Sequence, residues 1–490
     1  MSETGLINRE VERARLARLR RSGGAKLVLF SGRRRVGKTF LLNALWSPKE
    51  AFYFTASDTT DVQNRAALVA EFASWTAAPQ QAADFPTWRT VFRLLLEHDA
   101  GKPLVIILDE FQYLGGDTAA GLAAVASELN AAWEGRRCRR GVLLVLAGSA
   151  VAMMEALDGA AAPLHGRFDW KHRLEPFDYW DAGSMVPHRA LRDRAACYCV
   201  FGGMPRYLAA VDPARPLAEN VANQLLAPDG TVRTLVETVL LQERGLRDPT
   251  PYAAILRAIA DGRTDLNGIA QRAGLEEDTG LRFKIAKLVE LGLIRQERNV
   301  GAGRTTAFRY RLADHALRFY QRFVAAIQAT LVRQAPRDVW RQLIEPHFDS
   351  YLGLVFEGVA REAYFRHRSA LDLPIVTEWG RWEGQDRSRQ SIEVDIVART
   401  ADGAVMTGAV KWNRTPLEAQ WYRRHEAMLE RLSHSGVAWA HRALDPESPL
   451  LFLAAGGFDA GFRAAAGAAR RRVLLWTLED VYRGQRFKVS

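Results

Sequence analysis

One short stretch of the sequence has the residue types and spacing of a phosphate-binding loop. The stretch GRRRVGKT runs from Gly32 to Thr39 and follows the largely apolar run KLVLF, with only Ser31 between them. A glycine-rich loop between a buried strand and a helix presents several backbone N–H groups to an anion. In such a loop Lys38 reaches the β- and γ-phosphates and Thr39 holds Mg²⁺, so ATP and Mg²⁺ are the expected cofactors. The residues expected to bind the nucleotide here are Gly32, Arg33, Arg34, Arg35, Val36, Gly37, Lys38, Thr39 and Phe40.

A second stretch, LVIILDEFQYL, carries two adjacent acids at the end of an apolar run. Ligands of open α/β sheets lie at the carboxyl ends of the strands, which is where Asp109 and Glu110 would sit. We expect Asp109 to bind Mg²⁺ through water and Glu110 to polarise the attacking water. The pair therefore predicts hydrolysis as well as binding, with two ordinary surface acids as the alternative.

Three further segments contain weaker candidates. The run VLLVLAGSA ends in Ser149, which is placed to sense the γ-phosphate, and PLHGRF offers Arg167 as an arginine finger. Arg167 would act in trans only if subunits associate. The segment FGGMPRYL contains Gly203 and Pro205, a stiff turn that presents backbone to the adenine or simply links two helices.

Near the C-terminus, SIEVDIVARTADGAVMTGAVKW resembles the PD-(D/E)xK nuclease core, in which an Asp on one strand and a Glu-x-Lys on the next converge on a metal ion. Asp395 and Lys411 fill the Asp and Lys positions, but Ala409 stands where the Glu is expected. Metal-assisted phosphodiester hydrolysis needs several acidic oxygens. Two substitutes are present: Glu357, on the preceding helix, and Glu393, which shares a strand face with Asp395.

The turn between these two strands decides whether the nuclease-like residues can meet. A two-residue turn at Asp402 and Gly403 would pair Asp395 with Val410 and leave Lys411 on the opposite face. An active site requires an odd-length loop, and we expect three residues with Gly403 left-handed. We favour a domain that keeps the nuclease fold for DNA or partner binding without cleavage, and an active metal-dependent DNA nuclease is the alternative.

The elements that position these residues follow from hydrophobic patterning. Apolar runs at 26–31, 51–55, 104–108 and 142–147 alternate with amphipathic segments, which predicts an α/β fold with a parallel sheet. Residues 252–311 predict three short helices and a hairpin through Gly301 and Gly303, the pattern of a winged helix. Arg282, Lys284 and Lys287 fall on its recognition helix, so we expect DNA contact there. The alternative is a rigid lever for the ATPase.

Length and composition set outer limits on the interpretation. A chain of 490 residues predicts two to four domains. Its apolar runs are far shorter than the ~20 residues that cross a bilayer, and its start lacks a secretory signal, so we expect a cytoplasmic protein with no membrane partner. The three cysteines, Cys138, Cys197 and Cys199, predict reduced structural thiols. The charge of +11 and pI near 9.7 favour polyanion partners, or reflect an Arg-rich composition.

In this order the motifs resemble archaeal-type prokaryotic ATPases of the AAA+ and STAND superfamily with a C-terminal restriction-endonuclease-like domain. The segment INREVERARL adds Asn8 and Arg9, which match the family's motif near the adenine. The resemblance implies an ATPase domain over 1–245 with a helical lid from about 181, a winged-helix domain with a connecting helix over 246–335, and a nuclease-like domain over 336–490.

The same resemblance implies a nucleotide-driven conformational switch. We therefore expect an ATP-dependent switch that acts on DNA. The competing class is a signalling or chaperone-like ATPase with protein partners, and a nucleotide-dependent homo-oligomer is possible in either class.

Overall fold

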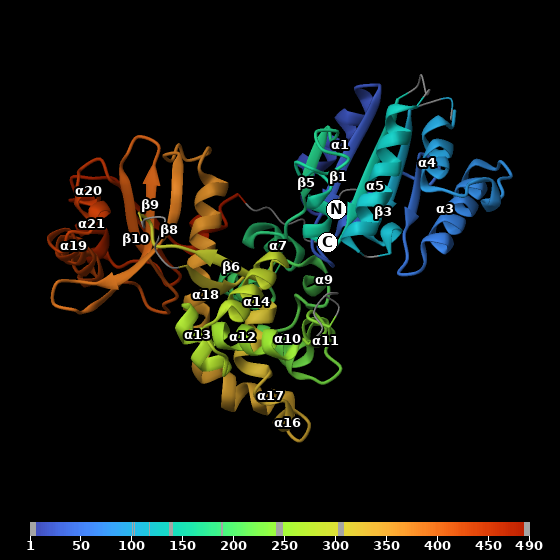
Figure 1. Cartoon of the computed structure of the whole chain (residues 1–490). Helices are drawn as coiled ribbons and strands as arrows, with labels where there is room; N and C mark the ends of the chain where they lie inside the picture. Colours follow the sequence, from blue (N-terminus) through green and yellow to red (C-terminus); the bar gives the residue numbers. More distant parts are fainter. Residues whose placement is uncertain are drawn as a thin grey trace. The chain divides into compact units, whose positions relative to one another are not determined.

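The computed structural model describes residues 6–99, 101, 103–116, 118–136, 141–187, 190–241, 248–301 and 308–484. The chain divides into two compact units, Met1–Pro176 and Phe177–Ser490, and each is described by itself (Figure 1). Among the described residues, no helix combines the length and the apolar character that crossing a bilayer requires.

The first unit is built on a five-stranded parallel sheet in the order β2-β3-β4-β1-β5. Every residue of β3 and β4 is buried, which is expected for parallel strands covered on both faces. The strands are β1 Ala25–Ser31, β2 Ala51–Thr55, β3 Leu104–Asp109, β4 Val142–Gly148 and β5 Trp170–Arg173. The four expected strands are thus present, and the parallel α/β class is confirmed. The short polar strand β5, WKHR, has no apolar run and was not expected.

Helices pack against this sheet and share one apolar core with it, in which Leu68, Phe92 and Leu129 join strand residues such as Phe52 and Leu144. Capping boxes at Thr60 and Thr87 begin α3 and α4. The helices are α1 Glu10–Arg21, α2 Lys38–Leu45, α3 Asp61–Thr76, α4 Trp88–Glu97, α5 Ala119–Glu134 and α6 Val151–Ala156, with short 3-10 turns η1 Ala82–Asp84 and η2 Phe111–Gly115.

The second unit begins with the helices of the expected lid. These are α7 Tyr179–Met185, α8 Leu191–Phe201, α9 Pro205–Leu208, α10 Leu217–Val221, the π-turn η3 Ala222–Leu226 and α11 Thr231–Glu237. They group with the C-terminal part of the chain rather than with the sheet of the first unit. Cys197 and Cys199 are buried free thiols in α8, and burial raises the pKa of Cys197 to about 12. Cys138 lies outside the described residues.

Three helices and a two-stranded antiparallel hairpin follow, as the sequence pattern predicts. They are α12 Thr250–Ala260, α13 Leu266–Ala273, α14 Thr279–Glu290, β6 Ile294–Glu297 and β7 Arg309–Leu312. Gly301 has a φ of 74°, whereas Gly303 lies outside the described residues. Short helices α15 His315–Phe319, α16 Gln328–Leu331 and α17 Pro336–Val339, with π-turns η4 Tyr320–Val324 and η5 Trp340–Ile344, lead into the C-terminal part.

The C-terminal part has a mixed five-stranded sheet in the order β12-β11-β10-β9-β8. Strands β8, β9 and β10 form an antiparallel meander, and β11 and β12 add in parallel. The strands are β8 Val376–Gln385, β9 Ser391–Thr400, β10 Val405–Lys411, β11 Leu450–Ala454 and β12 Val473–Trp476. The helices are α18 Glu345–His367, α19 Ala419–His434, α20 Ala438–Ala443, α21 Ala460–Gly467 and α22 Leu478–Val481.

Candidate functional site

The loop between β1 and α2 has a backbone that only particular residues tolerate. Gly37 precedes the helix with a φ of 95°, in the left-handed region. A Cβ on Gly32 would lie 2.8 Å from the carbonyl oxygen of Leu174, so a larger residue cannot fit without a shift. Arg35 is also left-handed, with a φ of 74°. A non-glycine residue with a left-handed backbone is energetically costly, and such residues cluster at ligand-binding sites.

Lys38 is enclosed by the loop that precedes it. The residue is 5% exposed, and its Nζ donates to the carbonyl oxygens of Gly32 at 2.7 Å and Arg33 at 3.4 Å. Burial lowers the pKa of Lys38, although Glu110 and Asp109 act in the opposite direction. The ammonium group is therefore held inside the concave loop, where phosphate oxygens would be expected to bind.

Asp109 ends β3 with its carboxylate fully engaged. It is 1% exposed, and its Oδ2 accepts from the Thr39 hydroxyl at 2.7 Å and from the Tyr53 hydroxyl. Burial and the neighbouring Asp109 raise the pKa of Tyr53, which therefore remains a hydrogen-bond donor. Thr39 and Asp109, expected to share Mg²⁺, are thus in direct contact, and their oxygens are ligands of the type that Mg²⁺ prefers.

Glu110 is held in a defined position beside this pair. Its backbone is left-handed, with a φ of 52°, and its Oε2 accepts from the Ser149 hydroxyl at 2.6 Å and from the Ser149 N–H at 3.2 Å. Gln112 Nε2 donates to the same oxygen. Gln112 is 1% exposed, and its Oε1 has no hydrogen-bond partner among the described residues. Sequence reasoning missed Gln112, whose only signal was its place two residues after Glu110.

The N-terminal motif is hydrogen-bonded to the segment that follows β5. Asn8 and Arg9 both have positive φ values, 55° and 72°, and Arg9 donates to the carbonyl oxygen of Glu175 at 2.8 Å. Glu175 follows Leu174, the residue that packs on Gly32. Arg9 is thereby linked to the segment that borders the phosphate-binding loop.

Other residues of the loop are less enclosed. Arg34 donates to the Tyr113 hydroxyl at 2.6 Å, next to the acid pair. Phe40 is 58% exposed on the first turn of α2, and Val36 is completely buried.

Arg167 is not brought to the phosphate-binding loop of its own chain. It precedes β5, at the amino-terminal edge of the sheet, and pairs with Glu134 at 2.9 Å. Any role in hydrolysis would need a second copy of the chain. Gly203 and Pro205 lie in the second unit, where Gly203 accepts from the Phe177 N–H at 2.8 Å and Pro205 begins α9. Their nucleotide contact stays a prediction.

In the C-terminal sheet, the β9–β10 hairpin has the loop that the nuclease-like arrangement requires. Thr400 N–H donates to the Ala404 carbonyl oxygen at 3.0 Å across a three-residue loop, and Gly403 has a φ of 89°. The register continues to Gly408 opposite Ile396, so Asp395 comes opposite residue 409. Asp395 and Lys411 therefore share a face, and Lys411 Nζ lies 2.7 Å from Asp395 Oδ2.

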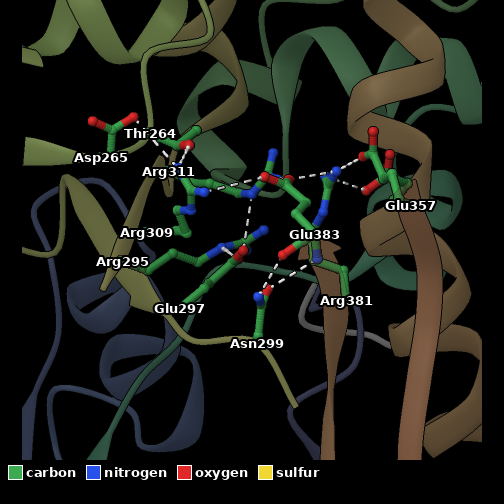
Figure 2. Close-up of polar contacts among 11 residues, drawn as sticks. Thr264, Asp265, Arg295, Glu297, Asn299, Arg309, Arg311, Glu357, Arg381 and Glu383 are labelled. Atoms are coloured by element: carbon green, nitrogen blue, oxygen red, sulfur yellow. Dashed lines mark hydrogen bonds and ion pairs between the residues drawn. The ribbon is translucent and has the colours of Figure 1, made fainter. Parts of the chain in front are cut away.

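Three carboxylates converge on this face. Oxygens of Glu357, Glu393 and Asp395 all lie within 4.8 Å of one another, a spacing compatible with one metal ion. We call these three residues the acidic cluster. Burial raises the pKa of Glu357, against the attraction of Arg381. Arg381 on β8 pairs with Glu357 at 3.1 Å and with Glu393 (Figure 2 shows the Glu357 pair).

The basic residues expected to contact DNA lie on α14, each with a partner inside the chain. Arg282 pairs with Glu277 at 3.1 Å, and Lys287 pairs with Glu290 at 2.7 Å. Lys284 Nζ donates to the Gly280 carbonyl oxygen at 3.3 Å. Phe283 beside them is 69% exposed. Their role at a DNA surface stays a prediction.

Comparison with known proteins agrees with the nucleotide site. Residues 6–211 match a family described as an ATPase domain predominantly from Archaea, and residues 320–424 match a family of archaeal and bacterial proteins of unknown function. An uncharacterized protein of Methanocaldococcus jannaschii is 23% identical over 412 residues, 83% of this chain and 87% of that protein.

Solved structures with similar architecture were also found. A Walker-type ATPase of Pyrococcus abyssi is 19% identical with a TM-score of 0.47, over 65% of this chain and 96% of that one. The ORC2 protein of Aeropyrum pernix is 16% identical with a TM-score of 0.42, over 67% of this chain and 95% of that one. The match over residues 6–211 agrees with the loop and acid pair of the first unit, which have the residues of an archaeal-type ATPase domain.

Proposed function

We propose that the chain hydrolyses ATP and uses the reaction as a switch that acts on DNA. Hydrolysis is supported best by the hydrogen bond from the Thr39 hydroxyl to Asp109, at 2.7 Å, next to Glu110, whose carboxylate is fixed by Ser149. A protein that only binds nucleotide has no need of the second acid.

Each residue of the site has a separable role in this proposal. Lys38 would contact the β- and γ-phosphates, and Thr39 and Asp109 would hold Mg²⁺, which when bound neutralises charge on the phosphates. Glu110 orients the attacking water and accepts its proton, once its carboxylate is released from Ser149. Ser149 and Gln112 therefore hold the base in a resting position in this structure.

Action on DNA is supported by charge and by local architecture. The chain has a formal charge of +11, and α12, α13, α14 and the β6–β7 hairpin have the order of elements that places a helix in a DNA groove. Because Arg282 and Lys287 are already paired with acids, phosphate contact would have to replace those ion pairs. Binding should therefore be strongly salt-dependent and modest in affinity.

Stimulation of ATP turnover by DNA tests this proposal. Steady-state phosphate release would be measured with and without duplex DNA at two salt concentrations, with Lys38→Ala as the inactive control. We expect DNA to raise turnover several-fold at low salt and the control to show none. Turnover that DNA leaves unchanged would reject the DNA switch and favour the signalling or chaperone-like class with a protein partner.

A second candidate function, metal-dependent phosphodiester hydrolysis, is supported by the acidic cluster. The three-residue hairpin loop brings Lys411 onto the face of Asp395, and Glu357 and Glu393 supply carboxylates that Ala409 cannot. The test is cleavage of supercoiled and linear DNA with ATP and either Mg²⁺ or Mn²⁺. Cutting that vanishes in Asp395→Ala supports the activity, whereas intact DNA beside normal ATP turnover rejects it.

A further inference from the structure

Arg381 lies on β8, the edge strand of the C-terminal sheet, with its guanidinium among carboxylates. Its Nη1 is 3.1 Å from Glu357, its Nη2 is 2.7 Å from Glu383, and it also pairs with Glu393. The Arg381 side chain is 13% exposed, and its Nε is buried with no hydrogen-bond partner in the described part of the chain. The guanidinium is thus committed to the carboxylates at the cost of an unsatisfied donor.

The Arg381 guanidinium pairs with the same carboxylates that a bound metal ion would need. The acidic cluster contains three carboxylates, and Arg381 and Lys411 pair with them, which leaves a formal charge of −1. A guanidinium and a divalent ion compete for the same oxygens, since each is stabilised by the same negative field. With Arg381 in place, entry of a metal ion must break the pairs to Glu357 and Glu393.

Side chains of the β6–β7 hairpin hold Arg381 through Glu383. Arg311 on β7 lies 3.4 Å from Glu383 and 2.9 Å from Glu297 on β6 (Figure 2). Arg309 lies 3.9 Å from the other oxygen of Glu383. Acidic and basic side chains thus alternate from Glu297 through Arg311, Glu383 and Arg381 to the acidic cluster. Displacement of Arg311 would therefore change the environment of Glu383, the carboxylate that pairs with Arg381.

The main chain that follows β6 is also hydrogen-bonded to β8. Val300 N–H donates to the Arg381 carbonyl oxygen at 3.3 Å, and Val300 is 2% exposed within the core of the C-terminal sheet. The Asn299 amide accepts from the Glu383 N–H at 3.1 Å and donates to the Glu383 carbonyl oxygen at 2.7 Å (Figure 2). The segment at 299–300 therefore pairs with the open edge of β8 in the manner of a short added strand.

We propose that Arg381 is an internal counter-ion that closes the acidic cluster, and that the β6–β7 hairpin holds it closed through Arg311 and Glu383. Displacement of the hairpin, by DNA or by a nucleotide-driven movement, would free Arg381 and admit a divalent cation. This inference rests on the second candidate function, because it describes how that same site is regulated.

Binding of Mn²⁺ to the full chain without nucleotide tests the closed state. Free Mn²⁺ would be measured by electron paramagnetic resonance during titration of wild type and of Arg381→Met, which removes the charge but keeps an unbranched side chain. Loss of Arg381 changes the formal charge of the cluster to −2, and we expect Mn²⁺ to bind about tenfold more tightly. Adding Asp395→Asn to this variant should abolish the gain and so assign it to the cluster rather than to Asp109.

The hairpin is tested by a matched pair of arginine variants. Arg311→Met removes the contact to Glu383, whereas Arg295→Met removes an arginine of the same hairpin that pairs with Glu297. We expect tighter Mn²⁺ binding in Arg311→Met and no change in Arg295→Met. Glu383→Gln, which keeps the shape of the link, is the second variant should Arg381→Met fail to fold, and it too should bind Mn²⁺ more tightly.

The outcomes separate the two proposals. Equal Mn²⁺ binding by wild type, Arg381→Met and Glu383→Gln, unaffected by Asp395→Asn, would overturn both the counter-ion and the metal-dependent activity on which it rests. A gain in Arg381→Met without a gain in Arg311→Met would overturn control by the hairpin and leave the cation site standing. Gains in both, with Arg295→Met unchanged, would support the full inference.

Discussion

At the scale of single residues, Glu110 offers the sharpest test of hydrolysis. Glutamine at this position can still accept from the Ser149 hydroxyl, which lies 2.6 Å from Glu110 Oε2, so the local structure should persist. It cannot accept a proton from water, and we expect Glu110→Gln to lower the rate of ATP turnover by about 10²- to 10³-fold. Phosphate release would measure the loss of turnover, and titration with a fluorescent ATP analogue would check that the nucleotide still binds. Turnover equal to wild type would exclude Glu110 as the base.

Tyr53 allows a prediction about the buried Asp109. Its hydroxyl donates to Asp109, and hydrogen bonds to charged groups contribute about 1.5–3 kcal/mol, against about 0.5–1.5 kcal/mol for neutral pairs. The matched control is Tyr364, whose hydroxyl donates to the neutral carbonyl oxygen of Pro374 at 2.9 Å. We expect Tyr53→Phe to lower the midpoint of thermal unfolding of its unit more than Tyr364→Phe lowers that of the other unit. Equal small shifts would mean that Thr39 and the Glu110 N–H satisfy Asp109 without Tyr53.

At the scale of elements, the β9–β10 loop depends on one glycine. Gly403 has a φ of 89°, and among the described residues an added Cβ would meet only Arg442 Nη2, at an ordinary 3.5 Å. Gly403→Ala should therefore lower the free energy of unfolding by about 1–2 kcal/mol through backbone strain alone. Gly467, on the last turn of α21, has no atom of the described residues within 4 Å of an added Cβ and is the control, so alanine there should be neutral or slightly stabilising. Chemical denaturation of both variants would measure the difference. A destabilisation no larger than in Gly467→Ala would contradict the strained conformation.

What the sequence predicted at this scale, and what it missed, has a physical explanation. Buried parallel strands are continuous apolar runs, so the sequence predicted β1 to β4. It did not predict β5, which is polar because it lies at the edge of the sheet. The odd loop at Gly403 followed from the two-residue period of strands. Arg381 and Gln112 were missed because their importance comes from partners that are brought together only by the fold: Glu357 for the one and Ser149 for the other.

At the scale of the whole chain, the division into units was not predictable from composition. The first expected domain boundary lies between 245 and 246, whereas the compact units divide after Pro176. Helices α7 and α8 share buried contacts with α18: Glu362 accepts from the Tyr179 N–H at 3.0 Å and from the Tyr198 hydroxyl at 2.8 Å. Such contacts join residues more than 160 positions apart and leave no local signal in the sequence.

Glu362 gives the second unit a distinctive dependence on pH. Its pKa is raised to about 7, mainly by burial and also by the charge of Asp178, while the hydrogen bonds from Tyr179 and Tyr198 and the charge of Arg295 oppose the shift. Because the folded chain holds this proton more tightly than the unfolded chain, stability falls as pH rises from about 4.5 to about 7. Glu362→Gln keeps an acceptor but has no proton to lose. Its free energy of unfolding relative to wild type should therefore rise by about 1 kcal/mol for each pH unit in that window.

His315 and His425 make the comparison with wild type necessary. Burial lowers both pKa values to about 3, so each histidine makes stability rise with pH up to the ordinary histidine range. That opposite slope is present in wild type and in Glu362→Gln alike and cancels in their difference. Urea denaturation of both proteins at pH 5, 6, 7 and 8 would measure it. A difference that stays constant across these values would mean that Glu362 is already ionised in the folded chain and that its carboxylate, rather than a carboxylic acid, joins α18 to α7 and α8.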